Sequence, residues 1–209
     1  MIDLSQIKNQ LAGRGAGILK QEGAMDSAII LPLVKVNEEL RVLFEVRAHH
    51  LRRQPSEICF PGGRIDSSDP TPEMAAIREL TEELGVDKSA VNVFAPLDIL
   101  VTPFRGIIYP FVAKLTDIDS ICVNTEEVDH IFTVPLSFLY NYEPERFSMG
   151  IRFEPGKNFP LDKISNKRSY SSRINLIPEL FYYYNDYVIW GITARILSHF
   201  LDITKPKST

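Results

Sequence analysis

The sequence predicts a mixed α/β layer fold, in which strands are followed by separate helices and then by further strands. Two observations favour this class. Residues 27–36 and 40–47 are rich in β-branched and aromatic residues and flank a short polar turn, which predicts a β-hairpin. Residues 72–84 instead carry apolar side chains at helical spacing. No shift in composition marks a second domain, so we expect a single domain over 1–209, with 1–26 as an N-terminal extension.

The composition excludes several classes of protein. Apolar residues make up 44% of the 209 residues and charged residues 24%, the usual mix of a soluble globular chain. The net charge of −4 provides no basic field for a nucleic acid or a membrane surface. No uncharged run reaches the roughly 18 residues that span a bilayer. The two cysteines, Cys59 and Cys122, lack metal-type spacing, so a reducing cytoplasm without a disulfide framework is expected.

Local signals place the first elements along the chain. Leu4, Ile7 and Leu11 have helical spacing and predict a short helix over 4–12. The turn of the expected hairpin is 37–39. For the helix over 72–84, Thr71 or Asp69 is the expected N-cap and Gly85 the expected left-handed C-terminal residue.

The second half of the chain predicts more strands and two helices. Strands are expected over 91–104 and 106–115 around the turn 103–106, and another over 128–136 precedes a short helix near 136–141. The runs "FSMGIRF" and "LFYYY" are strand-like. The segment 187–201 predicts a closing helix, because Ile189, Ile192, Ile196 and Phe200 would share one buried face.

Three glutamates on the helix over 72–84 are the candidate functional residues. Residues three or four apart share a helix face, so Glu79, Glu82 and Glu83 are expected to converge. Clustered carboxylates repel one another, and a hard divalent cation such as Mg²⁺ or Mn²⁺ removes that repulsion. The alternative is a solvated face with an exposed Arg78–Glu82 pair. The "PGG" turn and acidic loop that precede the helix favour the metal interpretation.

"RELTEELGV", residues 78–86, resembles the helical half of the Nudix box. The first half of that pattern differs: the spacing from Gly63 to Arg78 is one residue longer, and Pro70 occupies the position of the loop glutamate, with Asp69 as the nearest acid. The resemblance implies a Nudix fold, an α/β/α sandwich with a mixed β-sheet, with the Nudix box at about 63–86. It also implies an enzyme that hydrolyses a nucleoside diphosphate linked to another group, with Mg²⁺ or Mn²⁺ as cofactor.

The segment 43–63 is similar to an additional motif of the Nudix coenzyme A pyrophosphatases. Eight residues match it in register, whereas Phe44, Glu45 and Ser56 replace its usual Leu, Thr and Gly. The matching residues are Leu43, Arg47, Ala48, Arg52, Phe60, Pro61, Gly62 and Gly63. This resemblance implies a small-molecule substrate, coenzyme A or its thioesters, cleaved to 3′,5′-ADP and 4′-phosphopantetheine.

The resemblance also implies roles for single residues. Glu79, Glu82 and Glu83 would hold the metal together with the Gly63 carbonyl, and Arg78 would orient the carboxylates. Arg47 and Arg52, with Gly62 and Gly63, would bind the substrate phosphates, since arginine matches phosphate oxygens. Glu127, or Glu126 beside it, would bind metal or act as a general base. Surface positions are expected for His49 and His50. Trp190 is expected to pack in the core, and the alternative is that it lines the path of the pantetheine arm.

Two alternatives and the assembly state stay open at this point. The chain could act on another diphosphate, such as ADP-ribose or a dinucleotide, and only the segment 43–63 separates these substrates. It could also be a non-catalytic Nudix domain that binds a nucleotide or a protein, although such a module needs no clustered carboxylates. A homodimer is an assembly that the sequence leaves open.

Overall fold

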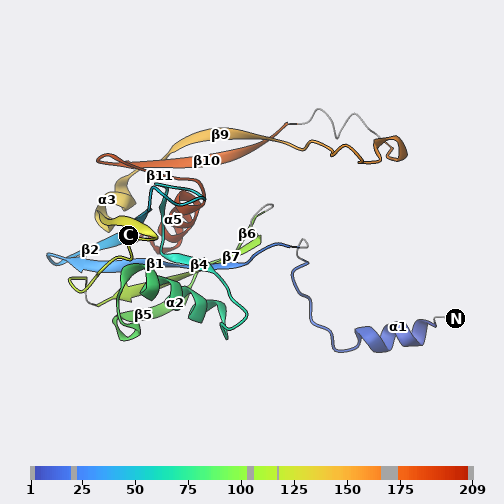
Figure 1. Cartoon of the computed structure of the whole chain (residues 1–209), viewed down its shortest axis with the longest axis horizontal. Coiled ribbons are helices and arrows are strands. Elements are labelled where there is room, and N and C mark those ends of the chain that lie inside the picture. Colours follow the sequence, from blue (N-terminus) through green and yellow to red (C-terminus); the bar gives the residue numbers. More distant parts are fainter. Residues whose placement is uncertain (1–2, 20–22, 103–105, 117, 166–173, 207–209) are drawn as a thin grey trace.

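A computed structural model describes residues 3–19, 23–102, 106–116, 118–165 and 174–206. Most of the turn expected over 103–106 therefore lies outside the described residues. The predicted mixed α/β architecture is confirmed (Figure 1): two sheets and their helices form layers around a central strand, β1.

The larger sheet has eight strands among the described residues, and β1 lies near its centre. β1 runs parallel to β7 and antiparallel to β2 and β4, which makes the sheet mixed. β8 and β3 pair with β2, and β5 and β6 pair with β7. The strands are β1 (Ser27–Val36), β2 (Glu39–Arg47), β3 (Ile58–Cys59), β4 (Gly62–Arg64), β5 (Val91–Pro96), β6 (Leu100–Thr102), β7 (Gly106–Leu115) and β8 (Val128–Pro135).

Helices cover both faces of this sheet, so β1 is buried on both sides. α2 (Pro72–Leu84) packs on one face, where Ile30 joins the cluster that holds Leu80 and Leu84. α3 (Leu136–Asn141) and α5 (Gly191–Thr204) pack on the other face, where Leu31 joins their cluster. Figure 1 shows α2 and α5 on opposite sides of the strands. Two 3₁₀ helices, η1 (Lys88–Ala90) and η2 (Leu161–Lys163), lie in the connections.

The smaller sheet consists of β9 (Glu145–Arg152), β10 (Ile174–Tyr184) and β11 (Tyr187–Trp190), all antiparallel. The prediction of one helix over 187–201 is wrong in its first turn, because residues 187–190 form β11. Asn185, with φ of 52°, turns the chain so that β11 pairs back onto β10. Ile189 is buried as expected, but it faces the core from a strand.

Two further predictions need correction. The expected strand over 91–104 divides into β5 and β6, because the ladder of β5 ends at Pro96 and the Leu97 side chain turns into the core. The "PGG" segment is not only a turn: its glycines open β4, which pairs with β1. Strands predicted at 27–36, 106–115, 128–136 and "FSMGIRF" are present with bounds that differ by at most two residues, whereas "LFYYY" is only the end of the longer strand β10.

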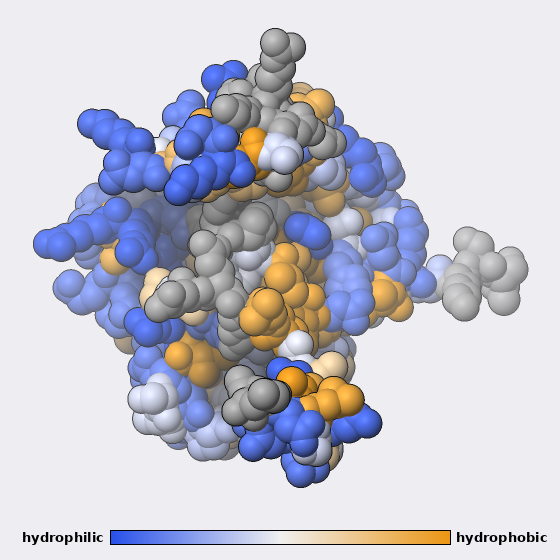
Figure 2. All heavy atoms as spheres, turned by 90° about the vertical axis from the view of Figure 1, so that its right-hand side faces the viewer, coloured by the Kyte–Doolittle hydropathy of each residue, from blue (hydrophilic) through white to orange (hydrophobic). Residues whose placement is uncertain are grey.

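The N-terminal helix α1 (Leu4–Leu11) has the predicted bounds to within one residue, but none of its residues is buried. It lies away from both sheets in Figure 1. Figure 2 shows apolar residues gathered near the middle of one face, with mostly hydrophilic residues around them. No helix among the described residues has the length and apolar character needed to cross a bilayer.

Both ends of α2 are fixed as the sequence predicts. The Thr71 hydroxyl accepts a hydrogen bond from the Met74 N–H at 3.2 Å, and Pro72 occupies the first turn. At the other end Gly85 has φ of 65°, and its N–H donates to the Thr81 carbonyl at 3.0 Å. A Cβ at Gly85 would lie 2.1 Å from the Cys122 carbonyl oxygen. The helix therefore ends where only glycine fits.

We expect Gly85→Ala to destabilise the protein by more than the roughly 1–2 kcal/mol that a left-handed conformation costs an L-residue, because the new methyl group also meets Cys122. Urea unfolding would measure the loss. Gly156→Ala is the matched control: apart from its own chain neighbours, no atom of the described residues lies within 4 Å of its Cβ position, so its effect should stay within about 0.5 kcal/mol. Equal stability of the two variants would contradict this account of the helix end.

Candidate active site

The three glutamates of α2 lie at different depths and do not converge on one point. The side chain of Glu82 is 56% exposed, that of Glu79 is 16% exposed, and Glu83 as a residue is 2% exposed. Among the described residues, no three His, Cys, Asp or Glu side chains are placed to surround one ion. The three glutamates thus lie on one side of the helix, but their carboxylates do not form a preformed site around one ion.

Arg78 connects the outer carboxylates. Its Nη1 donates to Glu79 Oε1 at 2.9 Å and to Glu82 Oε2 at 3.1 Å. Its Nε and Nη2 donate to the two oxygens of Asp69, at 3.1 and 2.9 Å. These hydrogen bonds lower the pKa of Asp69 and raise that of Arg78. Arg78 therefore orients two of the three glutamates, and Asp69, not the residue at position 70, holds Arg78 in place.

Glu83 faces inward and binds the loop that carries the glycines. Its Oε2 accepts a hydrogen bond from the Gly62 N–H at 2.8 Å. Burial raises the pKa of the Glu83 carboxyl well above its ordinary value, and the nearby charge of Glu45 raises it further. The Gly62 hydrogen bond opposes this shift but does not cancel it. The inner carboxylate thus lacks an adequate counter-charge.

Glu79 lies directly against Gly63. A Cβ on Gly63 would be 2.4 Å from the Glu79 Cδ, so any other residue here would displace the carboxylate. Burial raises the pKa of Glu79, while the Arg78 guanidinium lowers it in part. The close contact explains why the chain has glycine at this position, and it brings the backbone of β4 next to a carboxylate.

The downstream acids lie beside this group on the loop before β8. Glu127 is exposed, and its backbone carbonyl accepts a hydrogen bond from the Ala48 N–H at 2.9 Å. Its charge contributes to the raised pKa values of Glu79 and Glu83, which places it in their electrostatic surroundings. Glu126 is also exposed, and its Oε2 lies 4.0 Å from His50 Nε2. The side chains of His49 and His50 are 79% and 49% exposed, as expected for surface residues.

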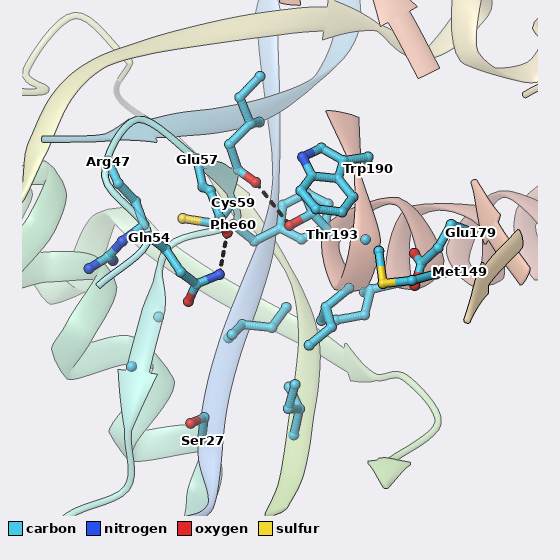
Figure 3. Close-up of a pocket in the computed structure, with 18 residues that line it drawn as sticks. Ser27, Arg47, Gln54, Glu57, Cys59, Phe60, Met149, Glu179, Trp190 and Thr193 are labelled. Atoms are coloured by element: carbon cyan, nitrogen blue, oxygen red, sulfur yellow. Dashed lines mark hydrogen bonds between the residues drawn. The ribbon is translucent and has the colours of Figure 1, made fainter. Parts of the chain in front are cut away.

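A pocket of about 460 Å³ lies between the two sheets and reaches Gly62 and Gly63. Figure 3 shows Arg47 and Gln54 on one side of it, and Trp190, Met149 and Glu179 on the other. Its remaining walls are mainly apolar and come from β1, β3, β7 and α5. The pocket therefore joins an apolar chamber to the glycine loop beside Glu79 and Glu83.

The two arginines of the segment 43–63 have different surroundings. Arg47 lines the pocket, and its Nε is buried without a hydrogen-bond partner among the described residues. Arg52 is exposed and is not among the residues that line the pocket. Arg47, Gly62 and Gly63 thus line the same pocket, whereas Arg52 lies outside it.

Trp190 is a correction to the sequence interpretation. It was expected to pack in the core, but it is 39% exposed and lines the pocket. Its ring stacks on Phe181, with centroids 5.8 Å apart. The reason is the β11 strand, which turns Ile189 inward and Trp190 to the opposite face.

Two residues near the site were not predicted. Glu45 on β2 is completely buried, and the Cys59 thiol donates a hydrogen bond to its Oε1 at 3.0 Å. Burial raises the pKa of Glu45 to about 7 and raises the pKa of Cys59 as well. One signal could have identified Glu45: a single acid within the apolar run "VLFEV".

Comparisons with known proteins agree with the resemblance found in the sequence. The family model described as "NUDIX domain" matches residues 26–150. "Uncharacterized Nudix hydrolase NudL" of Enterobacter sp. (strain 638) is 32% identical over 178 residues, which cover 82% of this chain and 78% of that protein. "Peroxisomal coenzyme A diphosphatase ndx-8" of Caenorhabditis elegans is 35% identical over 140 residues, which cover 66% of this chain and 56% of that protein.

The extent of these matches differs from one relative to another. Across three such relatives the matched segments span from 48% to 78% of the relative's own length. Among solved structures, the C. elegans Ap4A hydrolase binary complex is 20% identical with a TM-score of 0.46, and the match covers 53% of this chain and 80% of that one.

In the presence of a chelator, we expect the free energy of unfolding to fall as pH rises from about 4.5 towards 7. Folded Glu45 and Glu83 keep protons that their unfolded counterparts, with an ordinary pKa of 4.5, have released. Unfolding then releases protons, and higher pH favours it. Urea unfolding across this range would show the slope, and Glu83→Gln should reduce it. A flat or rising profile in the unsubstituted protein would contradict the raised pKa values.

Proposed function

The chain belongs to the Nudix hydrolase family, and from this premise we propose that it hydrolyses the pyrophosphate bond of coenzyme A or its thioesters. The products would be 3′,5′-ADP and 4′-phosphopantetheine or its acyl derivative. The observation that carries the proposal is the pocket in which Arg47 lies opposite Trp190 and Met149, and whose lining also includes Gly62 and Gly63. The similarity of the segment 43–63 to the coenzyme A motif, and of 66% of the chain to ndx-8, supports this substrate class.

The residues present suit a divalent cation. Glu79 and Glu83 are acids whose pKa values burial raises, which means that their charged forms lack compensation in the protein alone. Carboxylate oxygens are the ligands that Mg²⁺ and Mn²⁺ prefer. We assign the cation to Glu79, Glu82 and Glu83, with the backbone carbonyl of Gly63. When bound, such an ion neutralises phosphate charge and lowers the pKa of a bound water.

The protein's own side chains supply position and charge. Arg78 holds Glu79 and Glu82 through its Nη1, so removal of Arg78 would free both carboxylates to rotate. Arg47 offers a buried donor without a partner at the pocket wall, which suits a phosphate oxygen. Glu127 is the proposed acceptor for the proton of the attacking water.

The apolar half of the pocket suits the part of the substrate beyond the diphosphate. Ile192, Ile196 and Met149 supply apolar surface together with Trp190 from β11, and Glu179 lies on the same side of the pocket as Met149. A pantetheine arm offers methyl and methylene groups to such a wall. The other parts of the proposal are a single domain, a cytoplasmic location and assembly as a homodimer.

Product analysis tests the substrate. Coenzyme A, an acyl-coenzyme A, ADP-ribose, NADH and a diadenosine polyphosphate would be incubated separately with the protein and Mg²⁺ or Mn²⁺. We expect the highest kcat/KM for coenzyme A or its thioester, with 3′,5′-ADP as a product. Turnover of ADP-ribose or a dinucleotide alone would overturn the substrate while leaving the Nudix chemistry intact. Absence of turnover on every compound would favour a binding module.

Glu83→Gln tests the cation site in the same assay. The substitution keeps shape and helix propensity but removes one charge next to Gly62. We expect kcat to fall on the order of a thousandfold, because metal stabilisation is worth several kcal/mol and each 1.4 kcal/mol is tenfold in rate. The melting temperature of the metal-free variant should not fall. If the variant turns over substrate as fast as the unsubstituted protein, Glu83 is not part of the cation site.

Arg47→Ala and Arg52→Ala separate the two arginines. Loss of a charged contact in a partly dry pocket is worth about 1.5–3 kcal/mol, so Arg47→Ala should lower kcat/KM by roughly ten- to a hundredfold. Arg52 is exposed outside the pocket, so its variant should lose less. If Arg47→Ala has the same kcat/KM as the unsubstituted protein, Arg47 does not bind the substrate. If both variants lose the same factor in kcat/KM, Arg52 also contributes to the site.

A further inference from the structure

Glu45 is an anomaly that the proposed roles leave unexplained. It lies in the middle of β2, is 0% exposed, and is flanked in sequence by the buried apolar residues Phe44 and Val46. Its Oε1 accepts a hydrogen bond from the Cys59 thiol, but its Oε2 has no hydrogen-bond partner among the described residues. A buried carboxylate oxygen without a partner is costly, and buried polar groups in folded proteins nearly always have partners.

The position of Glu45 connects it to the candidate active site. Leu43, two residues earlier on β2, packs in the cluster that contains α2, and alternate residues of a strand face the same side. The Glu45 side chain therefore points to the layer that holds Glu79 and Glu83. After burial, the charge of Glu45 is the largest cause of the raised pKa of Glu83. The charges of Glu79 and Glu127 in turn raise the pKa of Glu45.

A purely structural role does not account for these surroundings. The Cys59 thiol is a weak donor and reaches only one of the two carboxylate oxygens. Arg47 follows two residues later on the same strand, yet its buried Nε also lacks a hydrogen-bond partner among the described residues. A carboxylate held only for packing would be replaced without loss by an apolar residue of similar size. Glu45 therefore combines a completely buried carboxyl group with an oxygen that has no hydrogen-bond partner among the described residues.

We propose that Glu45 is a fourth carboxylate of the divalent-cation centre, in which its unpaired oxygen and buried charge act together with Glu79, Glu82 and Glu83. This inference rests on the proposed function, because it requires the cation, but it does not depend on which diphosphate is the substrate. In the related motif, threonine is usual at this position, so Glu45 adds a charge that the motif lacks. Charges interact strongly where water is excluded, so Glu45 should increase the affinity for the ion.

Calorimetric titration of Mn²⁺ into the unsubstituted protein, Glu45→Gln and Glu39→Gln tests the proposal. Glu39 is the matched control: it lies on the same strand, but its carboxylate is paired with Arg41 and Ser137. We expect the Kd for Mn²⁺ to rise at least tenfold in Glu45→Gln and to stay unchanged in Glu39→Gln. Without metal, Glu45→Gln should melt no lower than the unsubstituted protein, and saturating Mn²⁺ should raise its melting temperature by less.

The outcomes distinguish this inference from the proposed function. If the unsubstituted protein and Glu45→Gln bind Mn²⁺ with the same Kd, Glu45 is structural and only the inference fails. If the unsubstituted protein binds no Mn²⁺, the proposed function fails first. Should Glu45→Gln not fold, Glu45→Thr restores the residue usual in the motif and serves the same comparison. A metal-free Glu45→Gln that is clearly less stable but keeps its Mn²⁺ affinity would also refute the inference.

Discussion

The close approach of α2 to β4 is the constraint on which the rest of the site depends. The Gly62 N–H binds Glu83, and Gly63 leaves room for Glu79 only because it has no Cβ. These contacts fix two carboxylates against the backbone from the helix side, while β4 is held from the other side by β1. Because β1 is buried between two helical layers, neither the strand nor the helix can move without disturbing a core. The packing of β1 on both faces therefore holds the site in place.

Electrostatics within the site are arranged by depth. Arg78, partly exposed, forms ion pairs with the outer acids Asp69, Glu79 and Glu82. No arginine or lysine forms an ion pair with Glu83 or Glu45 in the described part of the chain, and burial raises the pKa of both. The outer acids are thus in ion pairs, whereas the inner carboxyl groups of Glu45 and Glu83 are only partly compensated, by the Arg47 charge and by hydrogen bonds. Folding alone gives no reason to keep such inner carboxyl groups, whereas binding of a cation does.

Local signals in the sequence were sufficient for the elements whose ends are fixed by local chemistry. The helix over 72–84 is present with its Thr71 cap and its left-handed Gly85, since each depends on a few neighbouring residues. The hairpin turn after Val36 likewise depends only on a few neighbouring residues. By contrast, residues 187–190 have an apolar pattern that suits a helix or a strand, and only pairing with β10 decides between them. Trp190 was misplaced for that reason. The apolar run "VLFEV" signals that Glu45 is buried, but its neighbours could not be deduced, because they come from α2 and from β3, which pairs with β2.

The division of the site between two sheets has a consequence for specificity. The carboxylates and glycines lie on α2 and β4 of the larger sheet, inside the segment 26–150 that matches the family model. Trp190, Glu179 and the α5 residues that line the pocket come from beyond residue 150. The two parts share a core, because α5 packs in the cluster that holds Leu31 and Phe44, and Thr193 Oγ1 donates a hydrogen bond to the Ile58 carbonyl. The apolar residues of α2 belong to the other cluster, on the opposite face of the larger sheet. Under the proposed function, the first part of the chain would hold the cation, and both parts would line the pocket for the group beyond the diphosphate.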